Sequence, residues 1–97
     1  MIKSRKPLAV HPGEIINEIL NQNGLSQSAV ARHLRITHAR VNEVCRGKRG
    51  ISPDLAMKLG RAFGQNPTFW MNLQKNWELS QLNAEDYEHI EQIKLRA

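Results

Sequence analysis

Apolar residues recur every three or four positions along most of the chain, a spacing that is typical of helix faces. The first such group follows Pro12 and ends before Gly24. Proline suits the first turn of a helix, and glycine readily takes the left-handed conformation that follows the last turn. We therefore predict a first helix between these two residues. Its inward residues are Ile15, Ile16, Ile19 and Leu20.

Two shorter helices follow in quick succession. Ser26 and Thr37 are good N-cap residues, because a hydroxyl oxygen accepts a hydrogen bond from a free backbone N–H of the first turn. The inward residues are Val30, Ala31 and Leu34 in one helix and Val41 and Val44 in the other. The second helix stops at Gly47, and only Arg35 and Ile36 separate the first helix from the cap of the second.

Three further N-cap signals divide the rest of the chain. The dipeptides Ser-Pro at 52–53 and Asn-Pro at 66–67 open a fourth and a fifth helix, and the fourth ends at Gly64. Asn83 opens a weaker sixth helix. The inward residues are Leu55, Leu59, Ala62 and Phe63 in the fourth helix, Phe69, Trp70, Leu73 and Trp77 in the fifth, and Tyr87, Ile90 and Ile93 in the sixth.

This pattern predicts an all-α fold. No stretch alternates between apolar and polar residues as a half-buried strand would, and no segment repeats. A chain of 97 residues is enough for one domain with one core. We therefore predict a single domain over 1–97 with five helices and an additional C-terminal helix. The expected core residues are Ile16, Leu20, Val30, Leu34, Val41, Leu55, Leu59 and Phe63.

Composition narrows the class of protein. With 40% hydrophobic and 24% charged residues, the chain resembles ordinary globular proteins. Its single cysteine excludes an intrachain disulfide. No apolar stretch approaches the roughly 18 residues of a membrane span, and residues 1–8 lead into no apolar secretory segment, so we expect a cytoplasmic protein. A shared interface adds useful stability to so small a chain, which favours dimerisation.

Charge separates the two halves of the chain. Residues 1–50 hold nine Lys and Arg against three acids, a net charge of +6, whereas residues 51–97 carry −1. The basic half contains the two short helices, which over 26–47 have the spacing of a helix-turn-helix. In such a unit the outer face of the second helix enters the major groove of DNA. The alternative is that these basic residues form only a solvent-exposed face of an ordinary three-helix bundle, which would give the same pattern of charge.

Several separated motifs resemble one bacterial family. The segment SQSAVA at 26–31, followed by Ile36, Thr37, Val41 and Gly47, resembles the helix-turn-helix of the Xre/Cro-like repressors. The segments HPGE at 11–14, RGKRGISPD at 46–54, FWMNLQ at 69–74 and WEL at 77–79 are similar to the HigA branch of these repressors, also known as VapI. The resemblance covers residues 8–80.

The resemblance implies a lambda-repressor-like helix-turn-helix fold and a DNA-binding antitoxin. Such a protein neutralises a HigB-type ribosome-dependent mRNA endonuclease and represses its own operon as a dimer. Arg35 departs from the family, which often has glycine in this turn, so we expect a left-handed backbone at a cost of about 1 kcal/mol, or a slightly different turn. Two alternatives are a solitary Xre-type regulator without a toxin and a protein-only adaptor or inhibitor.

The residues expected at DNA lie in the helix-turn-helix and the loop after it. Arg40 can donate two hydrogen bonds to guanine, Asn42 can pair with adenine or bond a phosphate, and Ala39 can touch a thymine methyl. Glu43 can accept from cytosine or instead pair with Arg40 or Lys48. By resemblance, the glutamine of SQSAVA would hold a phosphate. The full expected set is Gln27, Thr37, His38, Ala39, Arg40, Asn42, Glu43, Arg46, Lys48 and Arg49.

Catalytic and metal chemistry are not indicated. No two of the four histidines lie three or four residues apart on one helix, and no triad partner is suitably spaced. We therefore expect no catalytic residue, no metal, no cofactor, no small-molecule substrate and no enzymatic activity.

The segment 65–97 is the predicted dimerisation segment. Its aromatic stripe is either core or a dimer surface. Its acidic residues form a solvated face or a contact for a basic ribonuclease partner. The expected interface residues are Phe69, Trp70, Leu73 and Trp77. The acidic residues are Glu78, Glu85, Asp86, Glu88 and Glu91.

Overall fold

The computed structural model describes residues 9–96, and all regular structure in this range is helical. The elements are α1 (Pro12–Asn23), α2 (Gln27–Leu34), α3 (His38–Cys45), α4 (Pro53–Phe63), α5 (Pro67–Ser80) and the 3-10 turn η1 (Ala84–Tyr87). The prediction of an all-α fold with five helices is confirmed. No helix within 9–96 is long and apolar enough to cross a membrane. The expectation about a secretory segment at 1–8 lies outside the described residues.

The predicted caps define where the helices begin. The hydroxyl oxygens of Ser26, Thr37 and Ser52 each accept a hydrogen bond from the backbone N–H three residues later, at 3.0 to 3.1 Å. Asn66 accepts from the N–H of Thr68 at 2.9 Å. These bonds satisfy backbone donors that have no partner within the helix.

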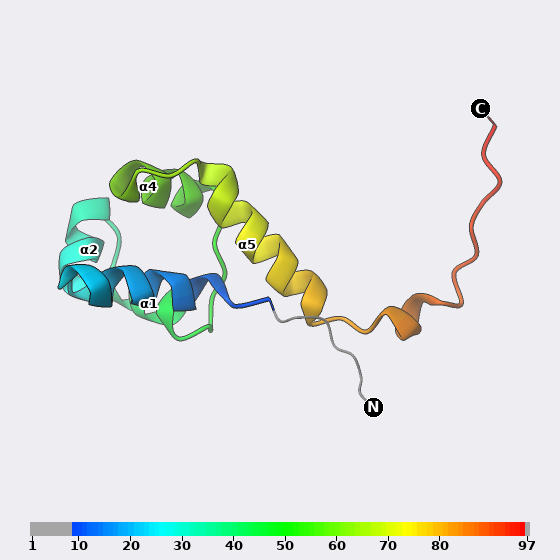
Figure 1. Cartoon of the computed structure of the whole chain (residues 1–97), viewed down its shortest axis with the longest axis horizontal. Helices are drawn as coiled ribbons and strands as arrows, with labels where there is room; N and C mark the ends of the chain where they lie inside the picture. Colours follow the sequence, from blue (N-terminus) through cyan, green and yellow to red (C-terminus); the bar gives the residue numbers. More distant parts are fainter. Residues whose placement is uncertain (1–8, 97) are drawn as a thin grey trace.

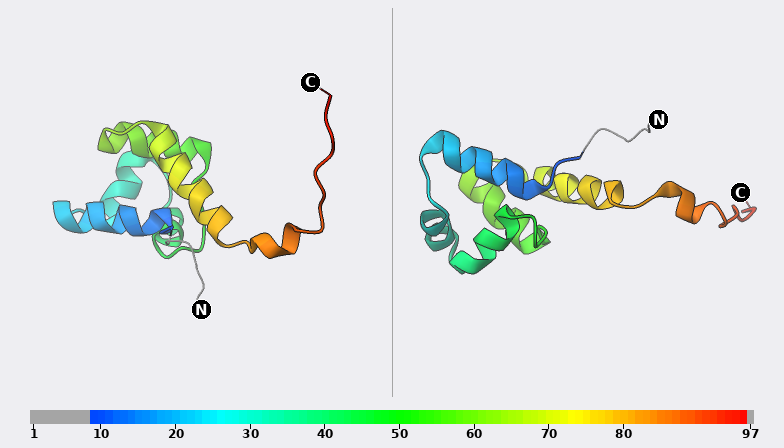
Figure 2. Two further views of the ribbon diagram at one scale, coloured as in Figure 1. Left: turned by 45° about the vertical axis from the view of Figure 1, so that its right-hand side comes forward. Right: turned by 90° about the horizontal axis from the view of Figure 1, so that it is seen from below.

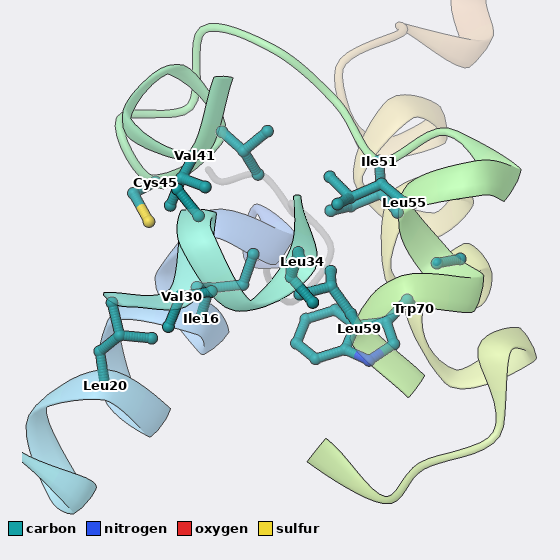
Figure 3. Packing of buried hydrophobic residues seen from close by; sticks show 13 residues of the cluster. Ile16, Leu20, Val30, Leu34, Val41, Cys45, Ile51, Leu55, Leu59 and Trp70 are labelled. Atoms are coloured by element: carbon teal, nitrogen blue, oxygen red, sulfur yellow. The ribbon is translucent and has the colours of Figure 1, made fainter. Parts of the chain in front are cut away.

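The five helices enclose one core (Figure 1). α1 packs against α3 and α5, α2 packs against α3 and α4, and α4 packs against α5. Figure 3 shows the side chains of these helices converging, with Leu59 beside Trp70. Seven of the eight predicted core residues are buried, and the eighth, Phe63, is partly buried against the same cluster.

The junction of α1 and α3 is unusually close. A Cβ atom added to Gly13 would lie only 1.9 Å from the carbonyl oxygen of Val44, so no side chain fits there. His11 is the N-cap of α1, and its Nδ1 accepts a hydrogen bond from the N–H of Gly13 at 2.9 Å. The imidazole is 6% exposed and packs edge-on against Trp77 of α5, with ring centroids 4.7 Å apart. His11 therefore joins the beginning of α1 to α5.

The predicted sixth α-helix is wrong. Asn83 does accept a hydrogen bond from the N–H of Glu85, but the helical turn that it caps ends at Tyr87. Ile90 and Ile93, expected on an inward face, are 64% and 73% exposed. The segment beyond η1 leads away from the body of the molecule (Figures 1 and 2). No helix within the described residues packs against it, so nothing offsets the cost of ordering a short helix.

Candidate nucleic-acid interface

α2 and α3 form the predicted helix-turn-helix. The turn between them places Arg35 in the left-handed region, at φ 62° and ψ 43°. The backbone N–H of Arg35 bonds the carbonyl of Arg32 at 3.2 Å, and that of Ile36 bonds the carbonyl of Ala31 at 3.0 Å. The family's frequent glycine at this place led us to expect either a left-handed backbone at Arg35 or a slightly different turn, and the structure shows the left-handed backbone. Thr37 then caps α3 immediately.

The inner faces of the two helices carry the apolar residues, which leaves the outer face of α3 free for recognition. The buried residues are Val30, Ala31 and Leu34 in α2 and Val41, Val44 and Cys45 in α3. His38 and Ala39 lie in the first turn of α3 and are exposed. The first turn of a recognition helix is the part that most directly meets base edges.

Two of the predicted DNA-binding residues contact each other. The Asn42 Nδ2 of α3 donates a hydrogen bond to the Gln27 Oε1 of α2 at 3.1 Å. Both side chains are half-buried. An amide has donors and an acceptor, so this bond leaves the Gln27 Nε2 and the Asn42 Oδ1 for a further partner. The pair therefore presents one amide donor and one carbonyl acceptor side by side at the junction of the two helices.

Arg40 is tied to the beginning of α4. Its Nη2 donates to the Ser52 Oγ at 3.2 Å, and its Nη1 lies 3.9 Å from an Asp54 carboxylate oxygen. Its Nε is buried without a hydrogen-bond partner among the described residues. This side chain therefore lies against the beginning of α4, which supplies an acceptor and a carboxylate within its reach. The interaction with Asp54 is exposed and therefore weak.

Glu43 pairs with Arg49, which the sequence did not indicate as its partner. Its carboxylate accepts a hydrogen bond from the Arg49 Nε at 2.9 Å, whereas Arg40 and Lys48 were the expected partners. Arg40 is held at Ser52, and the chain after α3 brings Arg49 back over Glu43. This ion pair reduces the net positive charge that Arg49 contributes to the surface.

The loop between α3 and α4, residues 46–51, carries the remaining basic side chains and is named here the connector. Arg46, Lys48 and Arg49 are exposed. Gly47 has φ 77°, a left-handed conformation that turns the chain out of α3. The connector therefore places exposed cations directly after the C-terminal end of α3, an arrangement that suits the sugar–phosphate backbone of a nucleic acid.

Two buried polar residues near the connector, His11 and Gln74, were missed as structural determinants. Gln74 is 5% exposed, and its Oε1 accepts a hydrogen bond from the backbone N–H of Ile51 at 2.7 Å. Burial lowers the pKa of His11, and the nearby Glu14 carboxylate opposes that shift in part. The position of His11 directly before Pro12 was a signal for an N-cap. For Gln74 no local signal existed, because its partner is 23 residues away.

The four residues of α5 that were expected at a dimer interface differ in how much of their surface is exposed. Trp70 has 0% of its surface exposed, so it belongs to the core of the protomer and offers no surface to a partner; its assignment to the interface is wrong. Its Nε1 donates to the Gln65 Oε1 at 2.7 Å. Phe69 is 41% exposed, and Leu73 and Trp77 are partly exposed. These three side chains leave apolar surface along one side of α5.

Comparison with known proteins places residues 16–70 in the Helix-turn-helix family. Virulence-associated protein I of Dichelobacter nodosus is 43% identical over 72 residues, which are 73% of this chain and 67% of that protein. Virulence-associated protein A' of the same organism is 40% identical over 76 residues, which are 77% of this chain and 66% of that protein. The chain thus spans about two thirds of the length of these relatives.

Similar chains have been solved together with DNA. The Pseudomonas aeruginosa antitoxin HigA with the higBA promoter is 39% identical, with a TM-score of 0.83 over 91% of this chain and 100% of that chain.

Proposed function

Because the chain belongs to the Helix-turn-helix family, whose match covers more than half of its length, we propose that it binds operator DNA sequence-specifically with α3 as the recognition helix. The main support is the exposed first turn of α3, together with the exposed Arg46 and Lys48 of the connector that follows this helix. The similar HigA of Pseudomonas aeruginosa was solved with promoter DNA. Relatives of this kind are helix-turn-helix regulators and antitoxins rather than enzymes.

Within this proposal, the residues take two kinds of role. His38 and Ala39 face base edges from the first turn of α3, and Arg40 joins them when it exchanges Ser52 for guanine. The Gln27–Asn42 pair offers its amide donor to a phosphate or its acceptor to a base. The remaining members of the set contact the backbone or orient their neighbours. They are Thr37, Glu43, Arg46, Lys48 and Arg49.

We further propose that the protein is an antitoxin. It neutralises a HigB-type ribonuclease toxin and represses its own operon. The similar HigA of Pseudomonas aeruginosa is an antitoxin, which supports this proposal. The exposed acidic residues of the C-terminal segment suit a basic ribonuclease as partner. They are Glu85, Asp86, Glu88 and Glu91.

The proposal includes a homodimer formed through the segment 65–97. Phe69, Leu73 and Trp77 leave apolar surface on α5, and five large apolar side chains beyond α5 are 48% to 81% exposed. These five are Leu82, Tyr87, Ile90, Ile93 and Leu95. A two-fold dimer would bring two recognition helices to successive major grooves about 34 Å apart on a palindromic operator.

A titration of DNA from upstream of the gene, at several salt concentrations, tests the DNA-binding proposal. Three phosphate contacts per protomer displace about six counterions from a dimer site, which gives a log–log slope near −5. A slope flatter than about −2 would instead favour a protein-only adaptor. A small ribonuclease-like reading frame beside the gene separates the antitoxin from a solitary regulator.

Paired variants separate base reading from general attraction to DNA. Arg40→Ala should weaken operator binding by about 1–3 kcal/mol and scrambled DNA much less. Lys48→Ala should weaken both duplexes by similar factors and reduce the salt slope by about one unit for each bound protomer. If Arg40→Ala weakens both duplexes equally, Arg40 is a phosphate contact, and His38, Ala39 and Asn42 are the leading readers.

A further inference from the structure

The two buried polar side chains of the described residues, His11 and Gln74, both lie against the connector. Gln74 bonds the backbone N–H of Ile51, the last connector residue. Its Nε2 in turn donates to the Glu78 carboxylate at 2.8 Å, so the amide is held at both ends. A Cβ added to Gly47 would lie 3.9 Å from the His11 ring. The inner side of the connector therefore packs against these two polar side chains. Within the described range, no other polar or charged residue is buried.

The contact at Gly50 is even closer. A Cβ atom there would lie 2.6 Å from the Gln74 Nε2 and 2.8 Å from its Oε1. A side chain at this position would therefore have to displace the Gln74 amide from beneath the connector backbone. The residue that follows, Ile51, is 4% exposed and anchors the end of the connector in the core.

The outer side of the connector carries the opposite chemistry. Arg46 and Lys48 are exposed there, and Lys48 lies two residues before the glycine that rests on Gln74. A shift of the Gly50 backbone toward or away from the Gln74 amide therefore moves the Lys48 ammonium group. α3 packs against α1 and α2, whereas α5 supports the connector backbone that carries these cations.

We infer that Gln74 is a positioning residue for DNA-backbone binding: through Ile51 and Gly50, α5 holds the connector so that Lys48 and Arg46 meet phosphates. This inference rests on the proposed DNA-binding function. Without the Gln74 acceptor, the connector has to be ordered again when DNA binds. Fixing the backbone of one residue corresponds to about a tenfold loss of affinity.

The test compares the full-length chain with Gln74→Leu, which keeps the approximate side-chain size and removes the acceptor. We expect faster hydrogen exchange at the Ile51 amide, about tenfold weaker operator binding, and a salt slope shallower by about one unit for each bound protomer. The double variant Gln74→Glu/Glu78→Gln reverses the polarity of the pair and keeps an acceptor for Ile51. It should restore the affinity, the slope and the slow exchange.

A destabilised control separates positioning from general loss of stability. Leu20→Ala removes a buried side chain at the opposite end of the cluster from Ile51 (Figure 3). It should lower the melting temperature without changing the salt slope. The inference is overturned if Gln74→Leu binds like the unaltered chain, if Leu20→Ala changes the slope equally, or if the double variant fails to restore binding. If the unaltered chain itself binds no DNA, the proposed function fails and the inference fails with it.

Discussion

Helix α4 and the segment that follows α5 both carry apolar residues at helical spacing, but their surroundings differ. Leu55 and Leu59 of α4 are 2% and 1% exposed, and α4 packs against α2 and α5. Ile90 and Ile93 of the C-terminal segment are 64% and 73% exposed. Both segments begin with a cap whose side chain bonds the first turn. Capping and spacing thus permit a helix, whereas an apolar partner surface makes it stable.

The size of the molecule reflects the same difference. Its radius of gyration is 17.0 Å, compared with about 13 Å for a compact chain of 100 residues. The C-terminal segment contributes to this excess, because it extends away from the five packed helices (Figure 2). Its acidic residues also repel one another in any short helix, which further disfavours continuation beyond Tyr87.

The largest expected effect concerns the core. Leu59→Ala should lower the free energy of unfolding by about 2–5 kcal/mol, because a fully buried leucine leaves a cavity among packed neighbours. The matched change Ile93→Ala in the C-terminal segment should cost less than about 0.5 kcal/mol in a dilute sample. Urea unfolding of both variants measures the contrast. Equal losses would show that the C-terminal segment is packed against the helices in solution.

The second expected effect concerns close packing in the body. Gly13→Ala should cost about 1–3 kcal/mol, because its Cβ would collide with the backbone carbonyl of Val44 and push α1 away from α3. The control Ala84→Leu enlarges an exposed side chain in η1 and should stay within about 0.5 kcal/mol of the unaltered chain. Thermal unfolding followed by circular dichroism compares the two. A neutral Gly13→Ala would contradict the close approach of α1 and α3.

The same contrast explains which features sequence reasoning predicted. Caps such as Ser26 and Thr37 act on backbone groups two or three residues away, so their identity and position are enough to predict them. The core faces follow from helical spacing. The bonds from Arg40 to Ser52 and from Ile51 to Gln74 join residues 12 and 23 positions apart. They depend on how the helices meet, which spacing along one helix does not determine.

The third prediction concerns the loss of folding stability at acidic pH and the part that His11 has in it. His11 accepts a hydrogen bond through Nδ1 and must be neutral there, and burial lowers its pKa from the ordinary value of 6.5. The unfolded chain therefore binds this proton more readily than the folded chain. The stabilising contribution is complete above about pH 6.5 and is lost as the pH falls through the unfolded and then the folded pKa.

Urea unfolding at about pH 7.5 and about pH 5 measures this loss. His11→Asn keeps a capping acceptor but does not titrate. It should therefore lose less stability between the two pH values than the unaltered chain. An unchanged pH dependence in His11→Asn would assign the acid sensitivity elsewhere.

The smallest expected effect on the protomer comes from removing the C-terminal segment. Truncation after Ser80 deletes side chains that are exposed in this structure, so the unfolding free energy of a dilute sample should change by less than about 0.5 kcal/mol.

At higher protein concentration the full-length and the truncated chain should differ in stability. Dimerisation through this segment makes the unfolding midpoint of the full chain rise with concentration, whereas the truncated chain should show a weaker rise. Sedimentation at matched concentrations measures the association directly. If truncation leaves the concentration dependence unchanged, the partly exposed side chains Phe69, Leu73 and Trp77 of α5 would be sufficient for the dimer.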